Sequence, residues 1–96
     1  MVYMTAQIKL YPGKLQAFIE LLNELTPVLG KHGIKLVGSY AGVVTRLNTV
    51  LDLWELPDPN AVEKLLSDPE LQKHGPRIAE IIEDEVLSIM TKLPIG

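Results

Sequence analysis

The hydrophobic residues of this chain follow the period of a strand in some segments and the period of a helix in others, and the order of these segments limits the possible folds. Apolar and polar residues alternate from Val2 to Leu10, which predicts a strand with one buried face. Across residues 14–29 apolar side chains recur at three- and four-residue steps, as on the buried side of a helix. Pro27 lacks an amide proton, so we expect this helix to kink or to end early.

The second half of the chain contains two more strands, a broken helical region and a last strand. Asp58 and Asp68 are each followed by proline, and this pair of residue types is typical of a helix start. The helical pattern continues towards Glu85, and Pro76 predicts a kink or a break within it. Residues 42–46 suit a hairpin connection between two strands. The expected strands are residues 34–41, 47–56 and 86–93.

The order β-α-β-β-α-β predicts an α+β fold of the split βαβ, or ferredoxin-like, type. In this fold a four-stranded antiparallel sheet carries both helical regions on one face. A chain of 96 residues fits a single domain, 1–96. Apolar side chains on the other face of the sheet would need a cover, because large apolar patches are seldom left to water. We therefore expect a homodimer.

Composition excludes several classes of function. The net charge is −3, and lysine and arginine do not cluster, so we expect no binding to nucleic acid. The chain has no cysteine and only two isolated histidines, so neither a disulfide nor a protein-built metal site is expected. No glycine-rich phosphate loop suggests a nucleotide cofactor, and we expect no cofactor. The chain also shows no signal peptide and no apolar run that could span a membrane, which favours a cytoplasmic protein without a membrane partner.

The third strand has one aliphatic face and one mixed face. In a regular hairpin that places Tyr40 opposite Val50, Leu51 and Leu53 would share the aliphatic face, and we expect this face to pack against the helices. The mixed face would then point away from the helices, into a cavity or a wet dimer interface, and a bulge would shift the assignment by one residue. The mixed face would hold Leu36, Gly38, Tyr40, Asn48, Val50, Asp52 and Trp54.

Three segments carry a resemblance to a known family. They are residues 10–14 (Leu-Tyr-Pro-Gly-Lys), 31–38 (Lys-His-Gly-Ile-Lys-Leu-Val-Gly) and 48–55 (Asn-Thr-Val-Leu-Asp-Leu-Trp-Glu). In this order and spacing they resemble the NIPSNAP family of the dimeric α/β-barrel superfamily. The resemblance implies a homodimer whose two sheets face each other across a barrel-like interior. Superfamily members include cofactor-free monooxygenases, polyketide cyclases and isomerases, and Asp52 stands where NIPSNAP-like chains often have histidine.

Asp52 is the candidate catalytic residue that the sequence favours most. Strand interiors disfavour aspartate, and a buried carboxylate is costly unless it is paired or protonated. Next to the indole of Trp54 the pKa of this carboxyl should rise, which suits a general acid or base. The alternative is a carboxylate satisfied by a neighbouring hydroxyl group, or by an arginine across the dimer interface.

Five further residues are candidates, and each has a structural alternative. Trp54 would stack on an aromatic substrate or anchor an interface. Tyr40 would bind a substrate oxygen or pack at the rim, and Asn48 would orient a carbonyl group or stabilise the hairpin turn. His74 and Arg77 lie one helical turn apart, where they would transfer a proton and bind substrate, or face solvent.

The sequence leaves two functions open. The first is a small enzyme that acts on an apolar, aromatic or polyketide-like molecule in a dimer-interior cavity, as a cyclase, an isomerase or a cofactor-independent monooxygenase. The second is a non-catalytic domain that binds a small molecule or another protein. The unusual pair Asp52 and Trp54 favours the enzyme by a narrow margin, whereas the scarcity of paired catalytic groups favours the binding domain.

Overall fold

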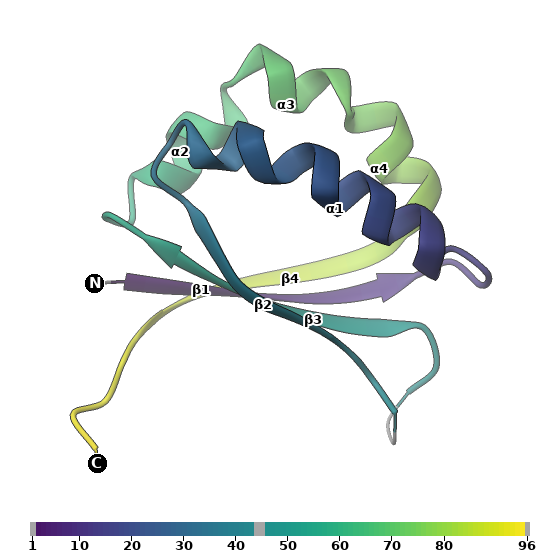
Figure 1. The fold of residues 1–96 in the computed structure, drawn as a ribbon, viewed down its shortest axis with the longest axis horizontal. Coiled ribbons are helices and arrows are strands. Elements are labelled where there is room, and N and C mark those ends of the chain that lie inside the picture. Colours follow the sequence, from purple (N-terminus) through teal and green to yellow (C-terminus); the bar gives the residue numbers. More distant parts are fainter. Residues whose placement is uncertain (1, 44–45, 96) are drawn as a thin grey trace.

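The computed structural model describes residues 2–43 and 46–95 and confirms the predicted ferredoxin-like α+β fold. Strands and helices follow one another in the expected order, except that the second helical region consists of three short helices (Figure 1). The predicted connection at residues 42–46 falls partly on residues 44 and 45, which lie outside the described residues. The elements are β1 (Val2–Leu10), α1 (Leu15–Gly30), β2 (Lys35–Ala41), β3 (Thr49–Leu56), α2 (Ala61–Leu66), α3 (Pro69–Lys73), α4 (Gly75–Ile81) and β4 (Ile82–Thr91).

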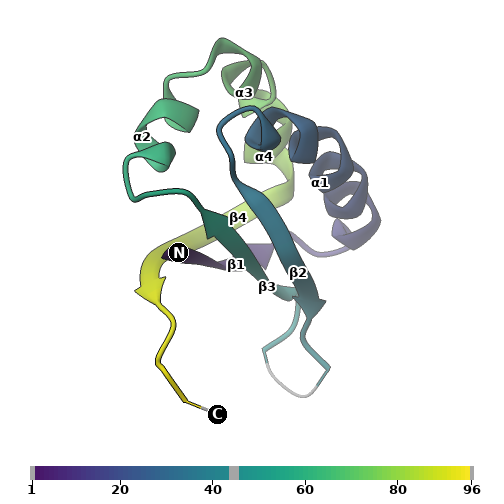
Figure 2. The same ribbon diagram turned by 60° about the vertical axis from the view of Figure 1, so that its left-hand side comes forward.

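The four strands form one antiparallel sheet in the order β2-β3-β1-β4. All four helices lie on the same face of this sheet, as Figures 1 and 2 show from two directions. No described helix covers the other face, which we call the open face. The molecule therefore has two layers, with its apolar core between the sheet and the helices.

Helix α1 passes through Pro27 and ends only at Gly30, so the expected early end is wrong. Proline at this position removes one amide donor, but the turn that follows carries Val28 and Leu29, and both side chains are buried. The packing of these two residues stabilises the last turn more than the missing hydrogen bond weakens it.

The second helical region begins and breaks close to the predicted points. Asp68 caps α3 by accepting a hydrogen bond from the Glu70 amide at 2.9 Å, as the sequence predicted. The prediction that Asp58 and Pro59 open the first of these helices is wrong, because α2 begins only at Ala61. Asp58 instead accepts a hydrogen bond from the Asn60 amide at 2.8 Å, in the turn just before α2. The predicted break near Pro76 is confirmed, because α3 ends before this residue and α4 begins next to it.

Strand β4 begins at Ile82, so the predicted helix for residues 82–85 is wrong. Ile82 lies opposite Leu10 and Glu85 lies opposite Ile8, which means that β4 pairs with β1 along its whole length. The local sequence of this segment continues the helical pattern. Pairing with the central strand outweighs that weak local preference, as tertiary context commonly does.

The pairing of β2 with β3 also differs from the regular hairpin. The register shifts at Val37, where β2 has a bulge, so that Tyr40 lies opposite Leu51 instead of Val50. The same shift places Ser39 opposite Asp52. A bulge adds one residue to one strand, so the residues that follow it on β2 change faces.

The prediction that the aliphatic face of β3 packs against the helices is also wrong. Asp52 lies opposite Ala6 of β1, and Trp54 lies opposite Met4. The helix-facing side of β1 is apolar along its full length, and its residues from Met4 to Leu10 are buried as predicted. Residues of β3 that share this side must therefore face the helices, and the aliphatic set that includes Leu51 faces the open side.

Candidate functional site

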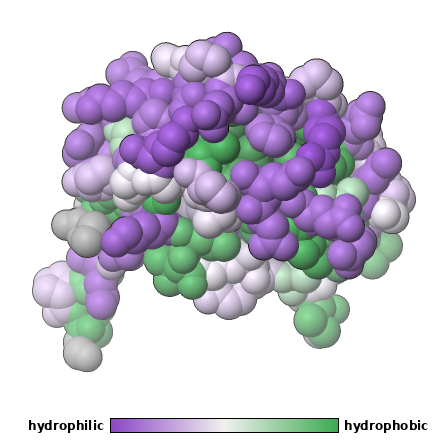
Figure 3. All heavy atoms as spheres, turned by 45° about the horizontal axis from the view of Figure 1, so that its top comes forward, coloured by the Kyte–Doolittle hydropathy of each residue, from purple (hydrophilic) through white to green (hydrophobic). Residues whose placement is uncertain are grey.

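An apolar cavity of about 270 Å³ lies between the sheet and the helices. Side chains from all four helices and from β1, β3 and β4 line it. Figure 3 looks down towards the helices and shows apolar atoms between their hydrophilic outer surfaces. Two ionisable side chains line the cavity, those of Asp52 and Glu85, and the other lining residues are aliphatic, aromatic or methionine.

Asp52 lies on β3, which forms one wall of this cavity. The residue is 2% exposed, and its Oδ1 accepts a hydrogen bond from the Ser39 hydroxyl group on β2. Burial raises the pKa of the Asp52 carboxyl above its ordinary value, and the Ser39 hydrogen bond opposes this shift in part. The arrangement holds the carboxyl in one orientation and favours its neutral form more than water does.

Glu85 is a second carboxyl at the cavity, and the sequence interpretation missed it. Burial among the lining side chains raises its pKa, and the negative charge of Asp52 adds to the effect, although part of the residue reaches solvent. The helical pattern assigned to residues 82–85 hid this position. The alternation of β4, followed backwards from Ile89 through Leu87, places Glu85 on the helix-facing side and could have identified it.

Trp54 lies two residues from Asp52 on the same strand face and lines the same cavity. It is 3% exposed, so its side chain is shielded from water. The cavity therefore combines a buried carboxyl with a large aromatic side chain, within one chain and without a partner subunit.

Tyr40 and Asn48 lie away from Asp52. Tyr40 is 57% exposed on the open face, opposite Leu51. Asn48 lies in the turn before β3 with a φ of 61°, and its carbonyl oxygen accepts a hydrogen bond from the Leu10 amide at 2.7 Å. Asparagine tolerates this left-handed conformation better than most residues, which agrees with the alternative role in stabilising the turn.

His74 and Arg77 do not line the Asp52 cavity either. His74 lies at the junction between α3 and α4, where its backbone carbonyl accepts a hydrogen bond from the Ile78 amide at 2.9 Å. Arg77 forms an ion pair with Glu24, and this contact joins α4 to α1. The guanidinium group of Arg77 is thus engaged between two helices.

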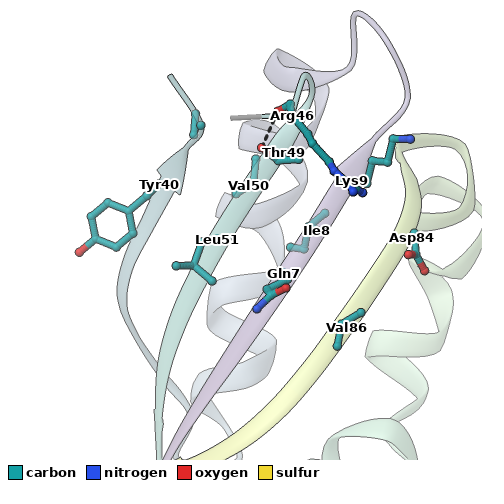
Figure 4. A pocket seen from close by; sticks show the side chains of 12 residues that line it. Gln7, Ile8, Lys9, Tyr40, Arg46, Thr49, Val50, Leu51, Asp84 and Val86 are labelled. Carbon is teal, nitrogen blue, oxygen red and sulfur yellow. Dashed lines mark hydrogen bonds between the residues drawn. The ribbon is translucent and has the colours of Figure 1, made fainter. Parts of the chain in front are cut away.

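The open face of the sheet holds a separate hollow of about 630 Å³ (Figure 4). One residue from each of the four strands contributes to a row across the hollow: Tyr40, Leu51, Gln7 and Val86. At one end Arg46 and Lys9 line the hollow, and the amino group of Lys9 forms an ion pair with Glu83 at 3.3 Å. Close to this row, the hydroxyl oxygen of Thr5 is buried and has no hydrogen-bond partner among the described residues.

A charged cluster joins the end of α1 to the start of α3. Asp68 Oδ2 lies 2.7 Å from His32 Nε2 and 3.1 Å from Lys31 Nζ, and Lys31 also contacts Glu70 at 3.2 Å. The His32 contact and the cap amide lower the pKa of Asp68 to about 2. Because Leu71 of α3 lines the cavity, this cluster fastens one of the helices that cover it.

Within residues 2–43 and 46–95, no three His, Cys, Asp or Glu side chains gather in a way that could hold a metal ion. In the same part of the chain, none of the helices has the length and hydropathy needed to cross a membrane.

Comparison with known proteins gives matches among solved structures alone. No family model matches the sequence, and no curated protein matches it either. A NIPSNAP domain protein from Burkholderia xenovorans, described as uncharacterised, superposes with a TM-score of 0.84 at 20% identity, over 100% of this chain and 98% of that chain. A NIPSNAP family protein of unknown function from Agrobacterium tumefaciens gives a TM-score of 0.79 at 21% identity, over 94% of this chain and 86% of that chain.

A cofactor-independent oxygenase from Streptomyces nogalater, SnoaB, gives a TM-score of 0.76 at 12% identity, over 98% of this chain and 94% of that chain. At these identities the comparisons establish the fold. The chain therefore has the ferredoxin-like fold of the NIPSNAP-family structures, as its sequence resemblance predicted.

Proposed function

We propose that this chain is a small enzyme that moves a proton to or from an apolar small molecule bound between its sheet and its helices. The observation that carries the proposal is the position of Asp52, which is 2% exposed and lines an apolar cavity. This site lies within one chain and replaces the expected cavity in a dimer interior. Asp52 is the proposed proton-transfer group, and Trp54 is the proposed aromatic surface for the substrate.

The environment of Asp52 suits general acid–base catalysis. An efficient catalytic group has a pKa near the working pH, and burial shifts the pKa of Asp52 in that direction. The Ser39 hydrogen bond fixes Oδ1, which leaves Oδ2 to meet a ligand. Cyclisation, isomerisation and cofactor-independent oxygenation of an acidic carbon compound can each begin with removal of one proton, so one such group would serve any of the three reactions.

The size of the cavity and the comparison with solved structures support this proposal. About 270 Å³ is slightly less than the roughly 300–1,000 Å³ of ordinary ligand pockets, so the ligand would be small. The structure of SnoaB, described as a cofactor-independent oxygenase, shares the fold over nearly the whole chain. A protein of this size and architecture can therefore carry out chemistry on a small molecule without a cofactor.

The alternative is a domain that binds a small molecule without turnover. One observation favours it: Tyr40, Asn48, His74 and Arg77 all lie outside the cavity. Chemistry would then depend on Asp52 and Glu85 alone. Binding without proton transfer would leave both carboxyl groups with a role in affinity only.

Hydrogen–deuterium exchange of 2-tetralone, an aromatic ketone with an acidic C–H group, separates the two functions. We expect the wild-type protein in D₂O to accelerate exchange at this carbon above the buffer rate, as followed by NMR spectroscopy. Asp52→Asn should lower the rate of protein-catalysed exchange by about 10²–10⁴-fold. Equal acceleration by wild type and variant would refute the role of Asp52. Quenching of Trp54 fluorescence by 2-tetralone without accelerated exchange would support the binding domain.

We also infer that two copies associate through the open face. Tyr40, Leu51, Val86 and Met90 are each 42–57% exposed on this face, where one chain leaves them uncovered. The unpaired hydroxyl group of Thr5 lies on the same side of the sheet. A second copy would cover the apolar side chains and supply polar partners, and buried polar groups usually have such partners.

A further inference from the structure

The cavity has an unbalanced charge. Asp52 and Glu85 line it, and no lysine, arginine or histidine does. A carboxylate in an apolar site is costly unless a positive group or several hydrogen bonds compensate it. Ser39 supplies one hydrogen bond to Asp52, and the described side chains make no recorded hydrogen bond to Glu85. Asp52 is therefore buried with one hydrogen bond and no positive partner at the cavity, whereas Glu85 is an exposed residue that reaches both the cavity and solvent.

The two carboxyl groups flank the same part of the central strand. Asp52 lies opposite Ala6 on β3, and Glu85 lies opposite Ile8 on β4. Both side chains turn to the helix side of the sheet, and the small side chain of Ala6 leaves room between them. Their mutual repulsion contributes to the raised pKa of Glu85. A positive group between them would relieve this repulsion and interact favourably with both.

The route into the cavity is acidic as well. Leu66 and Leu87 line the cavity and are 57% and 43% exposed, so the opening lies beside Glu85 on the β4 side. Residues 78–91 contain four acidic residues and no basic one. Two of the four do not add to this charge, because Asp84 points to the open face (Figure 4) and Glu83 forms an ion pair with Lys9 at 3.3 Å. An acidic approach raises the local concentration of cations and repels anions.

We propose that the ligand of this cavity is a protonated amine with an apolar body. The apolar body would pack against the aliphatic and aromatic walls, and the ammonium group would lie between Asp52 and Glu85. Trp54, next to Asp52 on β3, adds an aromatic face that attracts a cation. The inference rests on the proposed function for one point, namely that the cavity takes a ligand, and it narrows the substrate class.

Three matched probes test this inference: 3-phenylpropylamine, 3-phenylpropan-1-ol and 3-phenylpropanoate. They share one apolar body and differ in the charge of one end. Trp54 is the single tryptophan of the chain, so its fluorescence reports on the cavity directly. At pH 7 we expect the amine to bind at least about tenfold more tightly than the alcohol, because hydrogen bonds to charged groups are the stronger ones. The carboxylate should bind most weakly.

Variants show whether the preference comes from the two carboxyl groups. In the double variant Asp52→Asn, Glu85→Gln we expect the amine and the alcohol to bind within about threefold of each other. The control is the double variant Glu20→Gln, Glu63→Gln, which removes the same number of charges from the exposed sides of α1 and α2, outside the cavity, and should keep the full preference. Unchanged binding of the alcohol to the double variant would show that the cavity is still folded.

Two results would overturn the inference. The first is equal affinity of the wild-type protein for amine and alcohol, and the second is a preference for the amine that survives in the double variant. In either case the alcohol still binds, so the cavity remains a ligand site and the proposed proton transfer by Asp52 stands. If none of the three probes binds at millimolar concentration, both the ligand class and the proposed use of the cavity fail.

Discussion

Ser39 donates a hydrogen bond to the buried carboxylate of Asp52 across the β2–β3 pair, because the bulge at Val37 places these two residues opposite each other. The contact is the one side-chain hydrogen bond that the structure records for Asp52 among the described residues. It couples the edge strand β2 to the wall of the cavity. Its energetic consequences can be measured by substitution.

Asp52→Asn should raise the thermal stability of the protein at neutral pH. Burial raises the pKa of Asp52 in the folded state, so the folded form binds this proton more tightly than the unfolded chain does. The stabilising effect of protonation is fully present below the unfolded pKa of about 3.9, and it is lost as the pH rises through the folded pKa. An amide of equal shape carries no charge and avoids this loss.

Melting curves followed by circular dichroism at pH 8 and at pH 4 test this prediction. We expect the Asn variant to melt several degrees higher than wild type at pH 8, since each kcal/mol corresponds to about 4–8 °C in a domain of this size. The difference should shrink at pH 4. A variant that melts below wild type at pH 8 would contradict the prediction and indicate that the charged carboxylate is compensated in the folded protein.

Ser39→Ala should destabilise the protein by about 1 kcal/mol, the usual contribution of one hydrogen bond. It should also raise the pKa of Asp52 further, because the lost hydrogen bond favours the charged form. A double-mutant cycle with Asp52→Ala, which removes the accepting oxygen, isolates the interaction between the two side chains when it is measured by urea denaturation. Additive effects of the two substitutions would contradict a direct hydrogen bond.

Asp68→Asn should lower the melting temperature at pH 7 by a few degrees. Asparagine still caps a helix, so the change removes the negative charge that faces His32 and Lys31 and keeps the cap of α3. Because the folded pKa of Asp68 is lowered to about 2, its contribution is present above the unfolded value of about 3.9 and is lost as the pH falls towards 2.

The control for this prediction is Asp58→Asn. The Asp58 side chain accepts a hydrogen bond from the Asn60 amide just before α2, and no ion pair is recorded for Asp58. We expect this variant to melt within about a degree of wild type, as surface changes without special contacts usually do. If both variants show the same decrease in melting temperature at pH 7, the charged cluster at the end of α1 does not stabilise the position of α3. The loss in Asp68→Asn should also become smaller in high salt.

Leu51→Lys should convert a dimer into a monomer. Leu51 is 42% exposed in the middle of the open face, and a lysine there would place a charge in the proposed interface. Light scattering at micromolar concentration should give the variant the mass of a single chain, 10.6 kDa. The wild-type protein should have twice this mass. Leu15→Lys, at a residue of α1 that is 46% exposed, should remain dimeric. A folded wild-type protein with the mass of a single chain would refute the dimer.

Local patterns in the sequence were sufficient to predict several features of the site. The alternation of β1 predicted which of its residues are buried, and the order of strand and helix periods predicted the fold. The presence of aspartate between Val50 and Trp54 predicted a buried carboxyl beside an indole. Each of these features depends on residues that are neighbours along one strand or helix, where the period of side-chain direction is fixed by backbone geometry.

The tertiary structure decided where these features lie. Alternation assigns Asp52 and Trp54 to one face of β3, but pairing with Ala6 and Met4 of β1 determines that this face meets the helices. Pairing with β1 also turned Glu85 from a helical residue into a strand residue at the cavity. Such choices depend on contacts between segments that are distant in the sequence, so the period of a single segment carries no information about them.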